Sequence, residues 1–331
     1  MIDAENDMVI TGAVVIGRNE GERLKSCLNS VLGEVNYVVY VDSGSTDGSV
    51  EYAASLGISI ISLDISIPFT AARARNEGFF YLLNEHPELT FVQFIDGDCE
   101  VVDQWLTMAK NFLISHDDVA VVCGRRRERY PERSIYNLLC DIEWNTPVGQ
   151  TLACGGDALI RVKTLKAVGG YNASVIAGEE PELCVRIRQQ DMKVWRLDAD
   201  MTLHDANMTH FKEWWQRNVR SGFAFALGAA MHGAAPERHW VRESRRGRLW
   251  GLYLPSLIII ASIIQPEMLM LSGIYLLQIT RIAISLRSKI KTNWLYAIFI
   301  TLAKFPEAQG QIRFLLNRLM RKQNTIIEYK S

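Results

Sequence analysis

Paired cysteines are what this sequence most clearly lacks. Its six cysteines are scattered along the chain, and none forms a Cys-x-x-Cys pair. This spacing argues against a structural zinc site and against a disulfide framework. Thiols that stay reduced in a cytosolic compartment fit the pattern best.

An excess of charge of one sign is lacking as well. The 331 residues carry a formal net charge of −1, so no overall basic field favours nucleic acid as a partner. The basic side chains gather instead in residues 238–248 and in the last twenty residues or so. Basic clusters beside apolar segments indicate an anionic membrane surface.

A secretory leader is the third absence. Residues 1–8 are acidic, and no basic start precedes an apolar run. A glycine-rich phosphate loop with a lysine is also missing after the first expected strand, which argues against a nucleotidyltransferase. Apolar residues nevertheless make up 48% of the chain, which is enough for a sizeable core.

Strand-like apolar runs alternate with helical spacing through the first hundred residues. We expect strands at 9–16, 37–41, 58–63 and 91–95, with helices at 20–32, 47–56 and 69–84 between them. This alternation predicts a parallel sheet. Further along we expect helices at 103–115, 161–168, 180–190 and 211–231 and strands at 119–123, 193–197 and 201–204.

The character of the sequence changes after residue 248. Residues 249–264 and 268–280 are almost wholly apolar and are separated by Gln265-Pro266-Glu267. Sixteen helical residues span only ~24 Å against a hydrocarbon core of ~30 Å, so each segment is marginal alone. Together they predict a hairpin whose basic flanks place both ends in the cytoplasm. A soluble hairpin packed on the catalytic domain or in a dimer is the alternative.

The expected strand at 91–95 ends in Asp96-Gly97-Asp98. Two carboxylates suit a hard divalent cation, and the glycine lets the backbone turn tightly between them. In open α/β sheets, ligands bind outside the carboxyl ends of the strands. A cation at this place would hold a diphosphate. An ordinary turn after a strand is the alternative.

Other expected strand ends carry polar residues that suit a nucleotide. Glu20 and Asp42 follow the first and second strands and can accept hydrogen bonds from a base or ribose. Ser45 lies in a loop of small residues, 43–48, where the backbone can approach a flat ligand closely. Arg75 lies on the helix before Asp96, and a guanidinium binds phosphate in a bidentate manner.

Six motifs in order resemble one known family. They are Val14-Val15-Ile16-Gly17-Arg18-Asn19-Glu20, Asp42-Ser43-Gly44-Ser45-Thr46-Asp47-Gly48, Ala74-Arg75-Asn76-x-Gly78, Asp96-Gly97-Asp98, Cys154-Gly155-Gly156-Asp157 with Val168-Gly169-Gly170-Tyr171, and Gly178-Glu179-Glu180-Pro181-Glu182. Over roughly residues 10–225 the chain resembles the inverting glycosyltransferases of family two. The resemblance implies an α/β fold of GT-A type, with a mostly parallel central sheet flanked by helices. It also implies a nucleotide-diphosphate sugar as donor and Mn²⁺ or Mg²⁺ as cofactor.

The resemblance also implies roles for single residues. Asp98 would be the chief metal ligand, and Asp96 would contact ribose or metal. The residues that would hold the nucleotide are Glu20, Asp42, Ser45 and Arg75. Glu180 would be the catalytic base that deprotonates the acceptor hydroxyl. The family usually has Asp at that position, so Glu179 and Glu182 remain alternatives for the base.

Two later segments complete the predicted site. His204 follows a short expected strand, and some GT-A-type enzymes complete the metal sphere with a late histidine, so His204 is a candidate third ligand. Arg217 and Arg220 lie on the expected helix 211–231 and are candidates for contact with the diphosphate. A helix face that simply packs on the core is the alternative for that segment.

These observations predict a membrane-associated inverting glycosyltransferase whose catalytic domain lies on the cytoplasmic side of the cell membrane. We expect a catalytic domain at 8–240, a basic segment and membrane hairpin at 241–292, and a basic amphipathic helix or tail at 293–331. The acceptor would be a glycan or a lipid-linked precursor. The alternatives are a processive polysaccharide synthase and a nucleotide-sugar-binding protein without turnover.

Overall fold

The computed structural model describes residues 9–322, which divide into two compact units between Asn207 and Met208. Residues 1–8, on which the expectation of no secretory leader rests, lie outside the described residues. The end of the basic tail, 323–331, lies outside them as well. Unit 1 and unit 2 are named here for the parts before and after that boundary.

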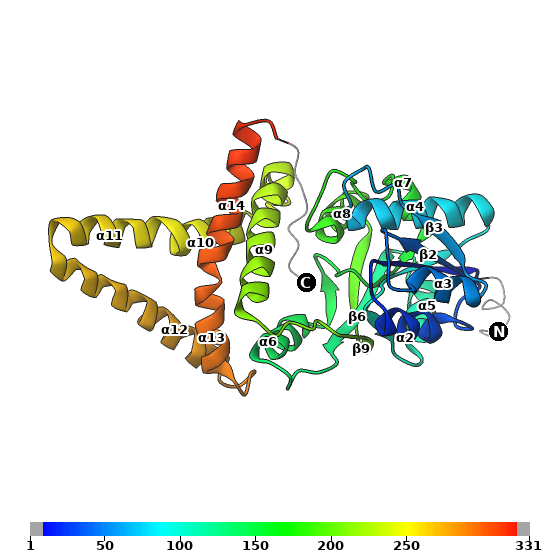
Figure 1. Ribbon diagram of the computed structural model, residues 1–331, viewed down its shortest axis with the longest axis horizontal. Helices are drawn as coiled ribbons and strands as arrows, with labels where there is room; N and C mark the ends of the chain where they lie inside the picture. The colour runs from blue at the N-terminus through cyan, green and yellow to red at the C-terminus, as the bar shows by residue number, and fades with distance from the viewer. Residues whose placement is uncertain (1–8, 323–331) are drawn as a thin grey trace. The chain divides into compact units, whose positions relative to one another are not determined.

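Unit 1 is built around a sheet of nine strands (Figure 1). The strands are β1 (Thr11–Gly17), β2 (Tyr37–Asp42), β3 (Ser59–Ser62), β4 (Phe91–Asp96), β5 (Cys99–Val101), β6 (Val119–Glu128), β7 (Gly149–Thr151), β8 (Ala158–Arg161) and β9 (Lys193–His204). The helices are α2 (Glu22–Val31), α3 (Ser49–Ser55), α4 (Ala71–Glu85), α5 (Trp105–Ser115), α6 (Ile135–Trp144), α7 (Val162–Ala167) and α8 (Glu179–Arg188).

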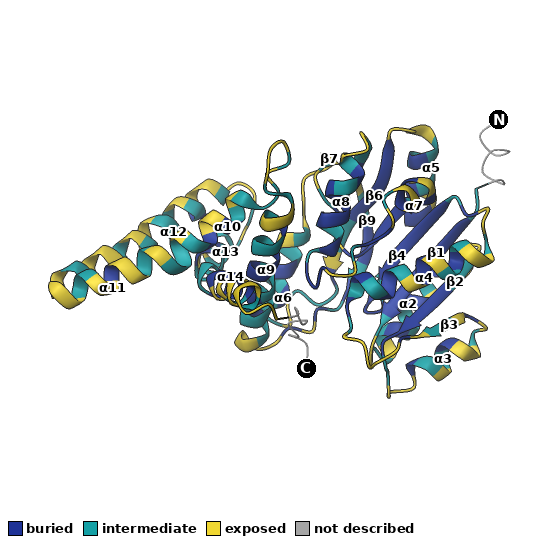
Figure 2. Cartoon of the chain, turned by 90° about the horizontal axis from the view of Figure 1, so that it is seen from above, coloured by how far each residue is buried: buried dark blue, intermediate teal, exposed yellow. Residues whose placement is uncertain are grey.

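The first half of the sheet is parallel, as the alternation of strands and helices predicts. Strands β3, β2, β1 and β4 are neighbours in that order, and each pair runs parallel. Figure 2 shows β1, β2 and β4 mostly in the colour of buried residues. Burial on both faces explains why their sequences are continuous apolar runs and do not alternate.

The second half of the sheet is mixed and was predicted less well. Strand β8 lies antiparallel between β4 and β6, and β9 pairs with β6 in parallel and with β5 and β7 in antiparallel fashion. Residues 193–197 and 201–204, expected as two strands, form the single strand β9. The short strands β5, β7 and β8 were missed because their pairing partners lie far away in the sequence. Helix α6 was missed as well.

All the regular elements in the described part of unit 2 are helices. Its elements are α9 (Phe211–His232), α10 (Val241–Arg248), the π-helical turn η1 (Leu249–Tyr253), α11 (Leu254–Ile264), the 3₁₀ segment η2 (Pro266–Ser272), α12 (Gly273–Leu286), α13 (Asn293–Leu302) and α14 (Lys304–Leu319). Helix α9, which we expected in the catalytic domain, packs in this unit against α14. The predicted tail 293–331 therefore contains two helices in its described residues.

Two glycines bring α9 and α14 into backbone contact. A Cβ atom at Gly310 would lie 2.0 Å from the carbonyl oxygen of Val219, and one at Gly222 would lie 2.0 Å from that of Glu307. Real Cβ atoms do not approach so closely, so both positions require glycine. The close crossing aligns the two helices even though about seventy residues separate them in the chain.

The apolar segments form longer helices than the sequence suggested. Residues Val241–Ile264 are helical over 24 residues and Pro266–Leu286 over 21, and a helix that crosses a membrane needs roughly 20. The first gains length because α10 continues through η1 into α11. Ile264 and Met270 are exposed by 82% and 83%, and Figure 2 colours much of α11 and α12 as exposed. By length and composition both helices are able to cross a membrane.

The glycine crossing generates a first prediction. The change Gly310→Ala should lower the stability of the protein by about 1–3 kcal/mol, since the added methyl group meets backbone atoms that cannot move aside. Gly273→Ala in α12 is the matched control, because nothing lies within 4 Å of its Cβ position. Thermal unfolding in detergent micelles measures both. A Gly310→Ala protein that melts at or above the wild-type temperature would contradict the close packing.

Candidate active site

The carboxyl ends of three parallel strands bring the predicted donor residues to one edge of the sheet. In the strand register, Gly17 of β1 pairs with Asp42 of β2, and Ile16 pairs with Asp96 of β4. The expectation that these strand ends share one edge is confirmed. Glu20 also reaches this edge, because a Cβ atom at Gly97 would lie 3.3 Å from its Cγ.

The loops after β1 and β2 are tied to each other. Asp42 is buried, and its Oδ2 accepts hydrogen bonds from the backbone N–H groups of Gly44 and Ser45 at 2.9 and 3.0 Å. The Ser45 hydroxyl accepts from the backbone N–H of Asn19 at 2.9 Å, and Asn19 Oδ1 accepts from that of Thr46 at 2.8 Å. Asp42 thus shapes its own loop, and that loop is fixed against the one that carries Glu20.

A buried arginine lies at the centre of the polar residues of unit 1. Arg75, only 2% exposed, makes ion pairs with Asp96 at 2.7 Å, with Glu180 at 2.9 Å and with Glu179 at 3.1 Å. Burial opposes its charge, yet the surrounding carboxylates, Glu180 foremost, hold the pKa of this guanidinium above its usual value. Arg75 thereby joins the end of β4 to the start of α8.

A second arginine, Arg126 of β6, holds the other oxygen of Asp96. Its Nη2 lies 3.0 Å from Asp96 Oδ2 and 2.8 Å from Asp157 Oδ2. Burial alone would raise the pKa of Asp96, but Arg75 and Arg126 together lower it. Gly156 makes room for this arrangement, because a Cβ atom there would lie 2.4 Å from Asp96 Oδ2.

Asp157 holds Asp96 and Arg126 in place through its own contacts. This fully buried carboxylate accepts hydrogen bonds from the backbone N–H of Asp96 at 3.0 Å and from the Thr202 hydroxyl at 2.7 Å. With the ion pair to Arg126, both of its oxygens are engaged. Asp157 therefore connects β4, β6 and β9 at the level of the site.

Helix α8 presents three carboxylates in its first turn. Gly178 precedes it with φ 81°, a left-handed conformation that only glycine adopts without strain, and this turn directs Glu179 and Glu180 toward Arg75. Glu182 is buried and bound through both oxygens to Arg186, at 2.8–3.1 Å. Of the three carboxylate side chains, Glu180 is the most exposed, at 13%.

The pKa of Glu180 is higher than that of an ordinary carboxyl group. Burial, and then the neighbouring charge of Glu179, raise its pKa to about 7, while Arg75 acts in the opposite direction. A carboxylate with this pKa is half ionised near neutral pH. It can therefore take up a proton there and release it again.

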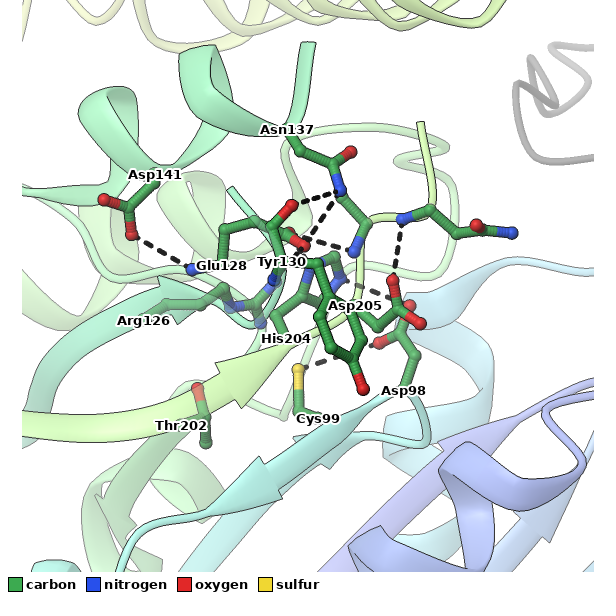
Figure 3. A network of polar contacts seen from close by, with 12 residues as sticks. Asp98, Cys99, Arg126, Glu128, Tyr130, Asn137, Asp141, Thr202, His204 and Asp205 are labelled. Carbon is green, nitrogen blue, oxygen red and sulfur yellow. Dashed lines mark hydrogen bonds and ion pairs between the residues drawn. The ribbon is translucent and has the colours of Figure 1, made fainter. Parts of the chain in front are cut away.

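Asp98 and His204 face each other on neighbouring elements (Figure 3). The pairing of β5 with β9 sets Cys99 opposite His204, and Asp98 Oδ2 lies 3.2 Å from His204 Nε2. The Cys99 sulfur lies 3.6 Å from Asp98 Oδ1. One carboxylate, one imidazole and one thiol within 4.8 Å of one another can hold a divalent cation. Asp96 lies in a second such group, with Cys99 and Asp157, although its own oxygens are bound to arginines.

A pocket of about 220 Å³ opens beside Asp98 and Cys99, with Tyr130 and Asp205 also in its wall. It carries charges of both signs, since arginines from α2 and from the segment after β6 line it as well. Ligand sites usually measure roughly 300–1,000 Å³. The pocket therefore describes the surroundings of Asp98 and not the whole space that a nucleotide sugar would need.

Most predicted site residues thus meet in unit 1, and Arg217 and Arg220 do not belong to that group. Both lie on α9 in unit 2, so their contact with a diphosphate stays a prediction. Arg126 and Glu128 were not predicted as site residues, and Asp157 was predicted only as part of a motif. The run of arginines at 125–127 was the available signal for Arg126, but nothing in it shows which side chain points inward.

Comparisons with known proteins find glycosyltransferases among the proteins that this chain resembles. Residues 13–163 match the model of the family described as "Glycosyl transferase family 2". Glycosyltransferase AglE of Haloferax volcanii is 33% identical over 173 residues, which cover 48% of this chain and 55% of the relative. Succinoglycan biosynthesis protein ExoA of Rhizobium meliloti is 27% identical over 190 residues, which cover 54% and 57%. The chain thus spans little more than half the length of these curated relatives.

A solved structure extends the likeness to most of the chain. The mannosyltransferase PcManGT from Pyrobaculum calidifontis, in complex with GDP-Man and Mn²⁺, superposes with a TM-score of 0.62. The match covers 93% of this chain and 87% of the other at 17% sequence identity, a level that speaks for the fold alone. The predicted GT-A-type fold is confirmed. Residues 13–163, a little under half of the chain, are similar to glycosyl transferase family 2.

Proposed function

We propose that this protein is an inverting glycosyltransferase that moves a sugar from a nucleotide-diphosphate donor to an acceptor hydroxyl. The observation that carries the proposal is the buried Arg75, which links Asp96 at the end of β4 to Glu180 on α8. A single charged network thus joins the edge of the sheet where a donor would bind to a carboxylate suited to be a base. The match of residues 13–163 to the family model and the names of the relatives support the same activity.

On the donor side, we assign the nucleotide to the loops after β1 and β2, which carry Glu20, Asp42 and Ser45. The small residues around Ser45 let the backbone approach the base and ribose. Asp96 is bound through both oxygens to arginines, which favours contact with ribose, or a supporting role, over metal ligation. Arg75 is engaged by Asp96 and Glu180. We therefore assign it the role of orienting these two carboxylates, in place of the direct contact with the nucleotide that was predicted from the sequence.

Asp98 and His204 would hold the divalent cation, Mn²⁺ or Mg²⁺. Their facing donor atoms fit such an ion, and the solved relative PcManGT was obtained with Mn²⁺ and GDP-Man. When bound, the cation would supply a Lewis acid for the departing nucleoside diphosphate. Asp98 also ties the turn between β4 and β5 to the end of β9, because its backbone carbonyl accepts a hydrogen bond from the N–H of Asp205 at 3.3 Å.

Glu180 would act as the base that takes the proton of the acceptor hydroxyl. Its pKa near 7 matches this task, since it binds and releases a proton near neutral pH. Glu182 is a weaker candidate because Arg186 occupies its carboxylate, and Glu179 is more deeply buried. The attack from the face opposite the leaving diphosphate would invert the anomeric carbon.

We also propose that unit 2 attaches the enzyme to the cytoplasmic face of a membrane. Its two apolar helices are long enough to cross, and α10 at their start carries Arg242, Arg245, Arg246 and Arg248. Such an anchor would bring the active site to a lipid-linked acceptor. ExoA, named for succinoglycan biosynthesis, supports an acceptor of the polysaccharide class.

The base assignment predicts a specific loss. Glu180→Gln should abolish sugar transfer to a lipid extract while nucleotide-sugar binding is retained, because only the proton acceptor is removed. Glu180→Asp keeps the charge and restores the residue usual in the family, so it should keep measurable activity. In the wild type, kcat/KM should fall about tenfold per pH unit below pH 7, where Glu180 becomes protonated.

Stability provides an independent check on Glu180. Its pKa is higher in the folded protein, about 7, than the 4.5 of an ordinary glutamate, so ionisation destabilises the fold as the pH rises through this interval. Glu180→Gln should therefore melt above the wild type at pH 8 and at about the same temperature at pH 4.5. A variant that transfers sugar as fast as the wild type would sink the assignment and favour a binding protein without turnover.

The cation assignment predicts metal-dependent transfer that is lost on mutation. Asp98→Asn and His204→Asn should each reduce transfer at a fixed Mn²⁺ concentration by at least about tenfold, and excess Mn²⁺ should recover part of the loss. Chelator should abolish wild-type activity. Asp118→Asn is the matched control, because this exposed carboxylate pairs with Lys193 at the surface. Wild-type activity that survives chelator would contradict the assignment.

The membrane proposal is tested by flotation with liposomes. The full chain should float with vesicles that contain anionic phospholipid, and replacement of residues 249–286 by a short flexible linker should abolish flotation. The linker variant must still bind nucleotide sugar, which shows that unit 1 is folded. A variant that floats as well as the full chain would show that the hairpin is not the anchor.

A further inference from the structure

His204 lies between two carboxylates, Asp98 directly before β5 and Glu128 at the end of β6. Strand β9, which carries His204, is flanked by β5 and β6. The register sets His204 opposite Cys99 of β5 and opposite Glu128 of β6. Figure 3 shows the imidazole with Asp98 on one side and Glu128 on the other.

The two ring nitrogens of His204 face different partners. Nε2 lies 3.2 Å from Asp98 Oδ2, and Nδ1 lies 3.8 Å from Glu128 Oε2. All three side chains are at least nine-tenths buried. The ring of Trp144 meets the imidazole edge to face at a centroid distance of 4.8 Å. Water is thus largely excluded from the imidazole.

Glu128 itself is fixed by three donors. Its Oε1 accepts hydrogen bonds from the backbone N–H of Tyr130 and from the side-chain amide of Asn137, both at 3.1 Å. Its Oε2 accepts from the backbone N–H of Ala206 at 3.0 Å. Asn137 belongs to α6, so the carboxylate is held from three segments of the chain. Oε2 still has room for a second donor, and His204 Nδ1 is aimed at it.

We infer that Glu128 is a positioning residue that fixes the tautomer and orientation of His204. A neutral imidazole carries a single N–H, and which nitrogen carries it is set by the hydrogen bond available to the other. Glu128 accepts that N–H from Nδ1, which leaves Nε2 unprotonated and directed at the cation beside Asp98. The 3.8 Å separation closes to a hydrogen bond by a small rotation of the ring. The inference rests on the proposed role of Asp98 and His204 as metal ligands.

This role differs from a purely architectural one. Glu128 also holds the segment after β6 through Tyr130 and Asn137, and loss of that support alone would loosen the site. An architectural role acts whether or not His204 is present. A positioning role acts only through the imidazole, and a double-mutant cycle separates the two.

The experiment measures Mn²⁺ binding to the full chain in detergent, from the electron paramagnetic resonance signal of the free ion. It is done with Mn²⁺ alone and with UDP or GDP present. Glu128→Gln should raise the dissociation constant roughly 10- to 100-fold, as loss of a carboxylate behind a metal-bound histidine does. In a His204→Asn background, the same change should have almost no further effect. Glu100→Gln is the matched control, because it removes an equal charge from β5, where Glu100 pairs with Arg129.

The outcomes are distinct. An equal loss from Glu128→Gln in both backgrounds, or an equal loss from Glu100→Gln, would overturn the positioning role, since charge or folding would then explain the effect. No loss from Glu128→Gln would overturn it as well. If Glu128→Gln does not fold, Asn137→Ala is the substitute, because it removes one of the three hydrogen bonds to Glu128 without removing charge. Asn137→Ala should lower the Mn²⁺ affinity of the wild type but should have almost no effect in the His204→Asn background. Wild-type affinity in His204→Asn would instead refute the proposed metal site, while transfer activity is scored separately.

Discussion

The structure of unit 1 depends on how a positive charge is kept inside it. Arg75 is almost completely buried, and removal of an arginine from water is costly unless its donors are paired. Its partners come from β4 and from α8, which are more than eighty residues apart in the chain. The sheet edge and the helix with the proposed base must therefore be in place together. Loss of either partner strand or helix would leave a buried charge with too few acceptors.

The second arginine, Arg126, extends the same constraint across the sheet. Arg126 shares Asp96 with Arg75 and also pairs with Asp157. Asp157 in turn accepts hydrogen bonds from a backbone N–H of β4 and from a hydroxyl group of β9. Charges alternate along this chain of contacts, so each group is stabilised by its neighbours. Gly156 is the steric counterpart of that arrangement, because a side chain there would occupy the space of the ion pairs.

The sequence predicts those features that depend on local pattern. The buried strands β1, β2 and β4 appear as apolar runs, and their parallel order brings Asp42 and Asp96 to one edge. The role of Arg126 could not be predicted from the sequence, for a physical reason. In the run 125–127, Arg125 and Arg127 pair with Asp141 and Asp200, while Arg126 alone turns toward Asp96, and only the register of β6 decides this. Glu128 was missed likewise, since its meeting with His204 depends on the pairing of β6 with β9.

The glycine crossing of α9 and α14 has a consequence for the order of events during synthesis. Helix α9 leaves the ribosome before residues 304–319 have been made, so its glycine face stays uncovered while the intervening seventy or so residues are translated. Those residues include both apolar helices. If they enter a membrane as proposed, insertion precedes closure of unit 2, and α14 completes the unit only after the bilayer has received the hairpin. Unit 2 would then close around its anchor only when its last helix is made, whereas all of unit 1 has been synthesised before it.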